Sequence, residues 1–163
     1  MITSVILKEL PFFQSFTMGE IDRLLENPDL VEHHKRGEYI IVQGSDQTRD
    51  LFVLVRGEVE ITNADHQHIT YLEAGSIFGE VSFITNQPRI SNVVALGEVI
   101  VVRIDKKSVD KVDPGLQLKI KDSLIDILIL RLGDMNLKLV EKDRANLALI
   151  KTLRERGGLE EPE

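Results

Sequence analysis

The chain has 163 residues, with 20 Lys plus Arg against 27 Asp plus Glu, a formal net charge of −7 and no cysteine. A chain of this length can build one domain whose core needs no cross-link, and the lack of cysteine excludes thiol catalysis, iron–sulfur clusters, disulfides and cysteine-based zinc sites. Net acidity argues against DNA as a direct partner, because phosphate binding requires a basic surface.

Apolar residues at helical spacing predict a helical lead over residues 1–30. Thr17 precedes the second apolar group and is a candidate N-cap, while Pro11 and Pro28 divide the region into short helices. The apolar positions are Leu7, Leu10, Phe13 and Phe16 in the first group, and Ile21, Leu24 and Leu25 in the second.

Between residues 31 and 105 the apolar period falls to about two, and glycines separate the runs. Short strands at roughly ten-residue intervals predict an antiparallel sandwich or barrel. The expected strands cover residues 39–42, 51–55, 59–61, 69–72, 93–95 and 99–102.

A long helix is predicted over residues 114–156, ending at Gly157 and Gly158 before an acidic tail over 157–163. Its apolar seam, broken by charges at 141–144, suits packing against a sheet or a second copy of the chain. We expect a homodimer through this helix; the alternative is a helix folded back in two pieces onto its own domain. The seam consists of Leu124, Leu128, Leu132, Met135, Leu139, Leu147 and Ile150.

No apolar run approaches the roughly 18 residues that a membrane span needs, since Asp126 interrupts the most apolar stretch, residues 124–130. Lys8 and Glu9 cut short the apolar start of the chain, so no secretory signal is recognised. We therefore expect a cytoplasmic protein without membrane insertion.

The segment 78–92 carries the chemistry. Between Gly57 and Val102 the chain holds no Lys and one Arg, Arg89, so this cation is expected to have a specific anionic partner. Gly79 permits close backbone approach, and residues 80–85 can form a short helix whose first N–H groups face an anion. An arginine beside such a helix outlines a phosphate site, and Glu80 could accept hydrogen bonds from a sugar hydroxyl.

The run Phe78-Gly79-Glu80, seven residues, then Pro88-Arg89 resembles the phosphate-binding cassette of the cyclic-nucleotide-binding domain family. That family includes the bacterial catabolite activator protein and the regulatory subunit of cyclic-AMP-dependent protein kinase. The resemblance extends to residues 10–13, 37–40, 43–45 and 51–59. It implies a mainly β fold with α: an antiparallel β-roll (double-stranded β-helix, jelly-roll-like) over 31–105, flanked by the helical lead and the long helix, in a single domain over 1–156.

By this resemblance, Arg89 would pair with the cyclic phosphate and Glu80 would accept from the ribose 2′-hydroxyl. The position after Arg89, usually Ala, Ser or Thr, is Ile90, and Ser91 can compensate one place later. The absence of Thr at both positions favours cyclic AMP over cyclic GMP. The implied ligand-binding residues are Gly79, Glu80, Val81, Arg89, Ile90 and Ser91, with Met135 and Asn136 as a purine cap.

The sequence contains no catalytic triad, paired-carboxylate arrangement or P-loop, so we predict a regulatory module and not an enzyme, with a cyclic nucleotide as regulatory ligand and no cofactor. Only 13 residues follow Ile150, where the family's transcription factors continue into a DNA-binding domain. We expect a stand-alone sensor that signals to a separate effector protein through its C-terminal helix. The sequence is equally compatible with a piece cut from a longer protein.

Two alternatives remain at this point. The chain can be a ligand-free interaction or scaffold protein on the same fold, with a degenerate pocket that Ile90 fills and in which Arg89 pairs with Glu80. His66, His68 and Glu73 have the spacing of a cupin metal motif, but Glu60 stands where that motif has glycine, and His66 falls in a predicted hairpin turn. We therefore predict no metal site.

Overall fold

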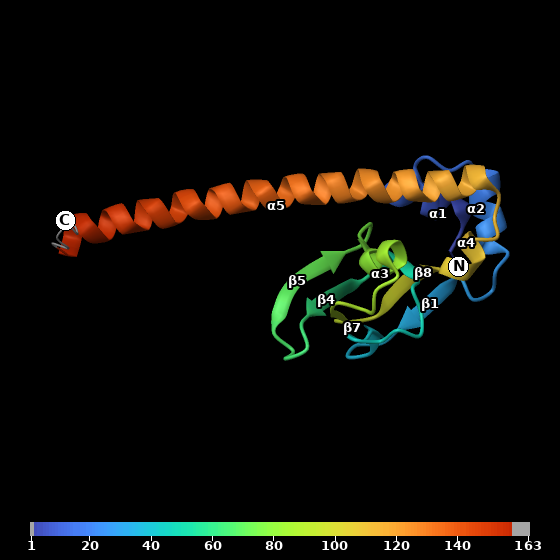
Figure 1. The fold of residues 1–163 in the computed structure, drawn as a ribbon, viewed down its shortest axis with the longest axis horizontal. Coiled ribbons are helices and arrows are strands. Elements are labelled where there is room, and N and C mark those ends of the chain that lie inside the picture. The colour runs from blue at the N-terminus through green and yellow to red at the C-terminus, as the bar shows by residue number, and fades with distance from the viewer. Residues whose placement is uncertain (1, 158–163) are drawn as a thin grey trace. The chain divides into compact units, whose positions relative to one another are not determined.

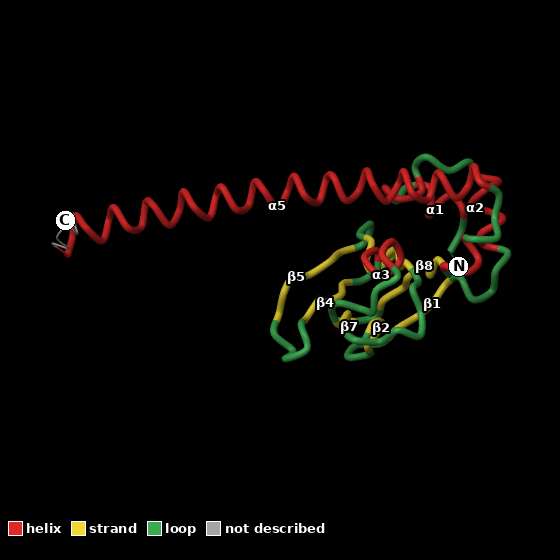
Figure 2. Tube along the Cα trace, in the orientation of Figure 1, coloured by secondary structure: helices red, strands yellow, loops and turns green. Residues whose placement is uncertain are grey.

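The computed structural model describes residues 2–157, so the predicted acidic tail lies outside the described residues except for Gly157. The chain forms two compact units, Met1–Leu124 and Ile125–Glu163. Figure 1 shows the ribbon and Figure 2 its helices, strands and loops. The first unit holds both sheets and the short helices, while the second consists of the continuation of the long helix.

The helical lead forms as predicted, in three short pieces: α1 (Ser4–Lys8), the 3-10 turn η1 (Pro11–Phe13) and α2 (Met18–Leu25). Thr17 caps α2 in a capping box, because its hydroxyl accepts from the Glu20 N–H (3.2 Å) while the Glu20 carboxylate accepts from the Thr17 N–H (2.7 Å). This reciprocal pair satisfies two backbone donors that would otherwise lack partners.

Three phenylalanines anchor the lead. Phe12, Phe13 and Phe16 are fully buried, with ring centroids 5.0 to 5.7 Å apart. Burying each ring stabilises the fold by about 1.5–3 kcal/mol, so this cluster holds a lead whose helices are too short to be stable alone.

The strands form two four-stranded sheets, with orders β1-β8-β3-β6 and β2-β7-β4-β5, in which every pair is antiparallel. Together with the flanking helices they confirm the predicted fold class. The strands are β1 (Val31–His34), β2 (Tyr39–Ile41), β3 (Leu51–Arg56), β4 (Glu58–Thr62), β5 (His68–Glu73), β6 (Ile77–Phe78), β7 (Asn92–Ala95) and β8 (Val99–Ile104).

One core cluster draws side chains from both sheets. Phe52 of β3 and Phe78 of β6 stack with ring centroids 5.2 Å apart, at the end of the cluster that adjoins the segment 78–92. Val59 of β4 and Val99 and Val101 of β8 are among the buried residues that these strands contribute to the cluster. The buried members are Ile41, Phe52, Leu54, Val59, Phe78, Val93, Ala95, Val99 and Val101.

Three helices follow β6. The predicted short helix over 80–85 is α3 (Glu80–Thr85), and the predicted long helix is α5 (Pro114–Gly157). The short α4 (Lys106–Val109) was not predicted, and Asp105 caps it by accepting from the N–H groups of Lys107 (3.2 Å) and Ser108 (3.1 Å). None of the described helices is long and apolar enough to cross a membrane.

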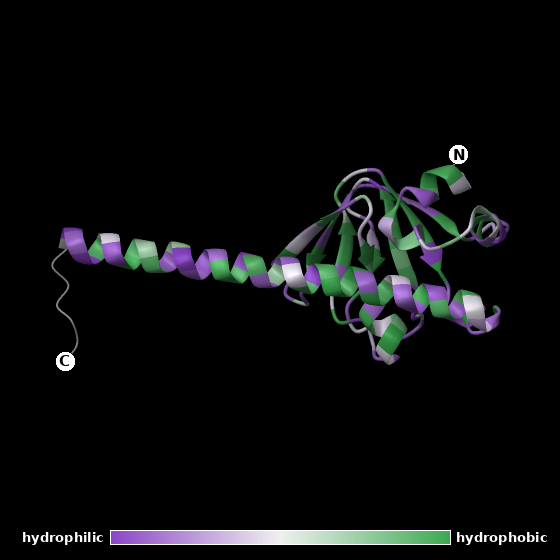
Figure 3. Ribbon diagram, turned by 90° about the horizontal axis from the view of Figure 1, so that it is seen from above, coloured by the Kyte–Doolittle hydropathy of each residue, from purple (hydrophilic) through white to green (hydrophobic). Residues whose placement is uncertain are grey.

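Helix α5 changes character at Leu124. Within the first unit it buries Leu116, Ile120 and Leu124. From Ile125 onward most of its large apolar side chains are exposed, with Ile127 and Leu128 half-buried, and hydrophobic and hydrophilic residues alternate along it (Figure 3).

The ion pair between Glu20 and Lys119, with Oε2 and Nζ 2.8 Å apart, joins α2 to the start of α5. The hydrogen bond from Lys119 and the Thr17 N–H lower the pKa of Glu20 from 4.5 to about 2. The stabilisation is therefore complete above about pH 4.5 and is lost as the pH falls toward 2. Because both side chains are partly exposed, solvent screening limits it to at most about 1 kcal/mol.

We expect Glu20→Gln to lose this stabilisation at pH 7 while keeping the N-cap, because Gln also serves in a capping box. The free energy of unfolding, measured by urea titration from pH 7 to pH 2.5, should decline less steeply in Glu20→Gln than in the wild type. Glu9→Gln, at an exposed site, is the control and should follow the wild-type curve. Identical pH dependence of Glu20→Gln and the wild type would contradict the assignment.

Candidate functional site

The segment 78–92 leaves the core at Phe78 and turns into α3 at Gly79. Gly79 is left-handed (φ +77°) and serves as the N-cap of α3. A Cβ at this position would lie 2.8 Å from the backbone oxygen of Asp50 and 2.9 Å from Nη1 of Arg89. Glycine is therefore required here for both its conformation and its lack of a side chain.

Arg89 is buried, with 5% of its surface exposed. Its Nη1 donates to the Gly79 carbonyl (3.1 Å), its Nη2 donates to the Thr48 hydroxyl (3.4 Å), and the guanidinium lies 5.8 Å from the centre of the Phe52 ring. The backbone is held too: the Gly44 N–H donates to the Arg89 carbonyl (2.7 Å), and the Arg89 N–H donates to the Ser45 carbonyl (2.9 Å). Both the main chain and the head group of Arg89 are thus fixed in place.

Burial lowers the pKa of Arg89, while the carboxylates of Asp50 and Glu80 act in the opposite direction. Arginine stays protonated in proteins, so the site carries a permanent positive charge. The two hydrogen bonds to Gly79 and Thr48 go to uncharged oxygen atoms. An anion that reached the guanidinium would gain a charge-assisted, potentially bidentate contact.

A second ionic group surrounds Asp50, a carboxylate with 2% of its surface exposed that directly precedes β3. Its Oδ2 pairs with Nε of Arg103 (2.7 Å), whose Nη1 pairs with Glu32 (3.0 Å). Burial acts to lower the pKa of Arg103, but the hydrogen bonds and charges of Glu32 and Asp50 outweigh it and raise the pKa. Lys106 joins this group, since its N–H donates to Asp50 Oδ1 (3.3 Å).

Lys106 also connects α4 to α3. Its Nζ donates to the Phe83 carbonyl and lies 4.6 Å from the centre of the Phe83 ring. Asp50, Arg103 and Lys106 were not predicted as site residues. The sequence did hold a signal for this group, because Asp50 stands directly before the apolar run 51–55. A carboxylate buried there requires a cationic partner.

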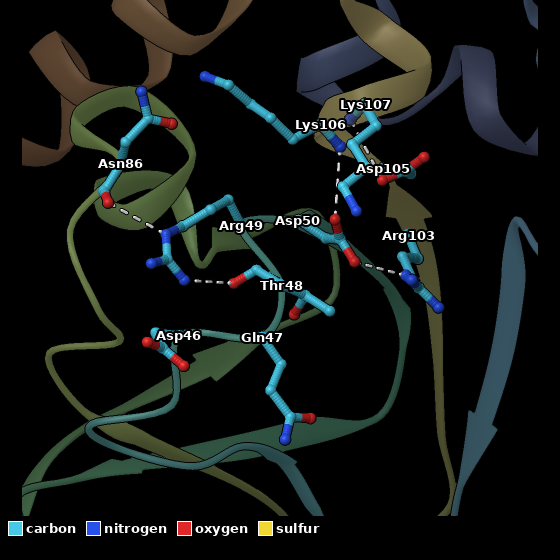
Figure 4. Close-up of a pocket in the computed structure, with 10 residues that line it drawn as sticks. All are labelled: Asp46, Gln47, Thr48, Arg49, Asp50, Asn86, Arg103, Asp105, Lys106 and Lys107. Carbon is cyan, nitrogen blue, oxygen red and sulfur yellow. Dashed lines mark hydrogen bonds and ion pairs between the residues drawn. The ribbon is translucent and has the colours of Figure 1, made fainter.

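Asp50, Arg103 and Lys106 of this ionic group line a pocket of about 440 Å³. Figure 4 shows the residues around it. Its walls come from the loop 46–50, from Asn86 at the end of α3, and from the junction of β8 and α4. Arg49 points across it and donates to the carbonyls of Asn86 (3.1 Å) and Thr48 (3.2 Å). Thr48 borders both this pocket and Arg89, but none of the predicted ligand-binding residues lines the pocket.

The structure brings Gly79 and Arg89, two of the predicted ligand-binding residues, into contact. Glu80 and Val81 are half-buried in the first turn of α3, and Ser91 is half-buried. The scaffold alternative requires Ile90 to fill the pocket. The Ile90 side chain is instead 60% exposed. Their roles in ligand binding stay predictions. Met135 and Asn136 lie on α5 beyond Leu124 with exposed side chains, and their role as a purine cap also stays a prediction.

Gln43 adds a polar atom beside the loop that holds Arg89. Its N–H donates to Asn92 Oδ1 (2.8 Å), but its buried side-chain oxygen accepts no hydrogen bond from the described residues. Buried acceptors are usually paired, so this oxygen can receive a donor from a bound ligand.

The two histidines of the cupin-like spacing have other contacts. His66 (φ +59°) lies in the turn between β4 and β5 and bonds to the Tyr39 hydroxyl (3.2 Å), while Nδ1 of His68 lies 2.9 Å from Glu60. Within residues 2–157, no group of three or more His, Asp or Glu is placed to hold a metal ion.

Comparison with known proteins points to one family. The model of the family described as cyclic nucleotide-binding domain matches residues 31–112. The cAMP-dependent protein kinase regulatory subunit of Mycosarcoma maydis is 29% identical over 94 residues, which cover 56% of this chain and 18% of the relative. Human cGMP-dependent protein kinase 2 is 33% identical over 70 residues, which cover 40% of this chain and 9% of the relative. The chain thus spans less than a fifth of either relative.

The crystal structure of Thermus thermophilus catabolite activator protein matches with a TM-score of 0.63 at 23% identity, covering 89% of this chain and 71% of that chain. This likeness supports the fold. The family match includes both sheets, Gly79 and Arg89, and it covers half of the sequence. The chain belongs to the cyclic nucleotide-binding domain family.

Proposed function

We propose that this chain binds cyclic AMP in preference to cyclic GMP and that Arg89 binds the cyclic phosphate. The single observation that carries the proposal is the buried Arg89, whose guanidinium donates to two uncharged acceptors and whose main chain is bonded to Gly44 and Ser45. The nearby carboxylates of Asp50 and Glu80 offset part of the cost of burying this charge. A phosphate in contact with the guanidinium would add charge-assisted hydrogen bonds.

As a member of the family, the chain is a regulatory module and not an enzyme, which confirms that prediction. In the proposed complex, Glu80 accepts from the ribose 2′-hydroxyl, and Gly79, Val81, Ile90 and Ser91 surround the phosphate. Neither of the two positions after Arg89, Ile90 and Ser91, is a Thr that could aid binding of guanine, and this supports the preference for adenine. Relatives that depend on cAMP and on cGMP both match, so the preference rests on Ile90 and Ser91.

The proposed signal begins in the ionic contacts around Asp50. Lys106 bonds to the Phe83 carbonyl in α3 and to Asp50, and it is the first residue of α4, which leads toward α5 in the chain. Movement of α3 on binding the phosphate would strain these contacts. A ligand acts in this way only if its affinity differs between two conformations.

Arg89→Ala should weaken binding of cyclic AMP by about 2–5 kcal/mol, a loss of roughly thirtyfold to several thousandfold, because the phosphate loses its charged partner. Isothermal titration calorimetry on both proteins measures this loss. Arg49→Ala is the control, since Arg49 is a nearby half-buried arginine bonded to backbone carbonyls. It should bind as the wild type does.

Calorimetric titrations that cannot distinguish Arg89→Ala from the wild type would refute the role of Arg89. Absence of heat with every cyclic nucleotide would instead favour the ligand-free scaffold. Thermal unfolding of each variant separates loss of binding from loss of folding.

Gly79→Ala tests whether the close approach at Gly79 positions Arg89. Gly37 is the matched control, because it has a similar left-handed conformation (φ +86°) and no atom within 4 Å of its missing Cβ. Gly37→Ala should lower the free energy of unfolding by about 1–2 kcal/mol through strain alone. Gly79→Ala should cost more and should also weaken binding of cyclic AMP, since its Cβ meets the Asp50 oxygen and the Arg89 side chain. Equal losses of stability with unchanged affinity would contradict this reasoning.

We also propose that the second unit forms a parallel homodimer. Counted from Ile125 to Leu153, every seventh residue of α5 is exposed, and four of these five residues are apolar. With these positions as heptad a, the d positions are Leu128, Met135, Lys142 and Leu149. The a positions are Ile125, Leu132, Leu139, Asn146 and Leu153.

Polar residues in this seam favour one register. A single Asn at an a position, here Asn146, favours two strands in register at a cost in stability. In a parallel pair, Lys138 at g faces Asp143 at e of the other helix, an attractive contact. Lys142 at d opposes the dimer by placing two like charges near the seam.

Leu139→Glu at position a should convert the dimer to a monomer in sedimentation experiments. Leu137→Glu is the matched control at position f, and its side chain is exposed to a similar degree, 65% against 58%. It should leave the dimer intact. A wild-type chain that sediments as a monomer at 100 µM, or equal effects of both substitutions, would contradict the proposed seam.

A further inference from the structure

The outer face of the sheet β2-β7-β4-β5 carries a row of side chains that crosses all four strands. Tyr39 pairs with Val94, Val94 with Glu60, and Glu60 with Tyr71. Directly paired residues in antiparallel strands point to the same face. The chain has two tyrosines, and both lie in this row. We call Tyr39, Glu58, Glu60, Tyr71 and Glu73 the acidic–aromatic face.

Contacts with two histidines hold the side chains of this row in place. The ring of His68 lies 4.2 Å from that of Tyr71, and its Nδ1 lies 2.9 Å from Glu60. Tyr39 is held by His66 through its hydroxyl. Tyr39 and Tyr71 are nevertheless 46% and 57% exposed. Rigid, exposed tyrosines are typical of binding surfaces, because little side-chain entropy is lost when a partner covers them.

The charge of this face is of one sign. The strands β2, β7, β4 and β5 contain no Lys or Arg. Glu58 and Glu73, both exposed, stand directly opposite each other on β4 and β5. Like charges in this position destabilise a strand pair, and a cation placed between them would relieve the repulsion. A cation over Tyr71 would also meet the face of an aromatic ring.

Strand β5 offers a backbone edge beside these groups. It is the terminal strand of its sheet, and among the described residues it forms a ladder with β4 alone. A register shift near Ile69 interrupts the ladder, so the regular part is 70–73. Lys or Pro commonly protects such an edge, and β5 has neither.

We propose that the acidic–aromatic face binds an extended, basic segment of a partner protein, which adds as a strand along β5. The segment places one Lys or Arg beside Glu73 and Glu58 and a second, two residues away, beside Tyr71 and Glu60. The residue between them is apolar and lies on the inner side next to Leu72, which packs against the core. The recognised pattern is therefore cation, apolar residue, cation. This inference does not depend on nucleotide binding.

The test uses the full chain and a ten-residue probe peptide of alternating Arg and Val. A peptide of alternating Glu and Val is its control. Amide shifts in ¹H–¹⁵N spectra should change mainly in β5 and β4 with the Arg peptide and nowhere with the Glu peptide. Shifts spread over the acidic surface, or binding of the Glu peptide, would overturn the proposal.

Two variants and one control sharpen the result. Tyr71→Ser, and the double variant Glu58→Gln with Glu73→Gln, should each weaken binding of the Arg peptide at least fivefold. The double variant should unfold at an equal or higher temperature, because it removes the repulsive pair. Glu98→Gln changes an exposed carboxylate outside the face and should leave the affinity unchanged. Equal weakening by all three would show general charge attraction and refute the site.

Arg89→Ala should bind the peptide normally, which separates this inference from the nucleotide proposal.

Discussion

The burial of one positive charge organises the first unit. Arg89 lies at the end of the core, over Phe52, and it is fixed by acceptors from two different loops. This arrangement is possible only because residue 79 has no side chain, so the guanidinium can approach the backbone where β6 turns into α3. The turn, the start of the short helix and the loop around Gly44 and Ser45 thus all meet at Arg89.

A buried arginine contributes little to stability as such, because desolvation offsets its attractive contacts. An apolar residue of similar volume would often serve the fold equally well. The structure instead keeps a charged group in a fixed orientation, which is the expected design of a preorganised binding site. The exposed side chain of Ile90 leaves this site without the filling residue that a degenerate pocket would need.

Local patterns in the sequence predicted most of the fold. Thr17 capped its helix as expected, the apolar runs formed strands, and Glu80–Thr85 formed the expected helix. The placement of Arg89 beside the start of the short helix was expected from a count of cations and from the family resemblance. These features depend on residues that are close in sequence or on a recognised motif.

The features that sequence reasoning missed depend on distant pairs. Asp50 accepts a hydrogen bond from Arg103, which lies 53 positions later in the sequence. Arg103 also donates to Glu32, which lies 71 positions earlier. No local period reveals such partners. The acidic–aromatic face likewise requires the strand register, including the shifts near Ile69 and between Tyr39 and Ile41. Helix α4 is only four residues long, too short to show a helical period.

The most direct test of the central claim is a crystal structure of the full chain with cyclic AMP bound. We predict that a phosphate oxygen accepts hydrogen bonds from the Arg89 guanidinium and that the ribose 2′-hydroxyl donates to Glu80. Cyclic AMP bound instead in the pocket beside Arg49, with Arg89 still bonded only to Gly79 and Thr48, would contradict it.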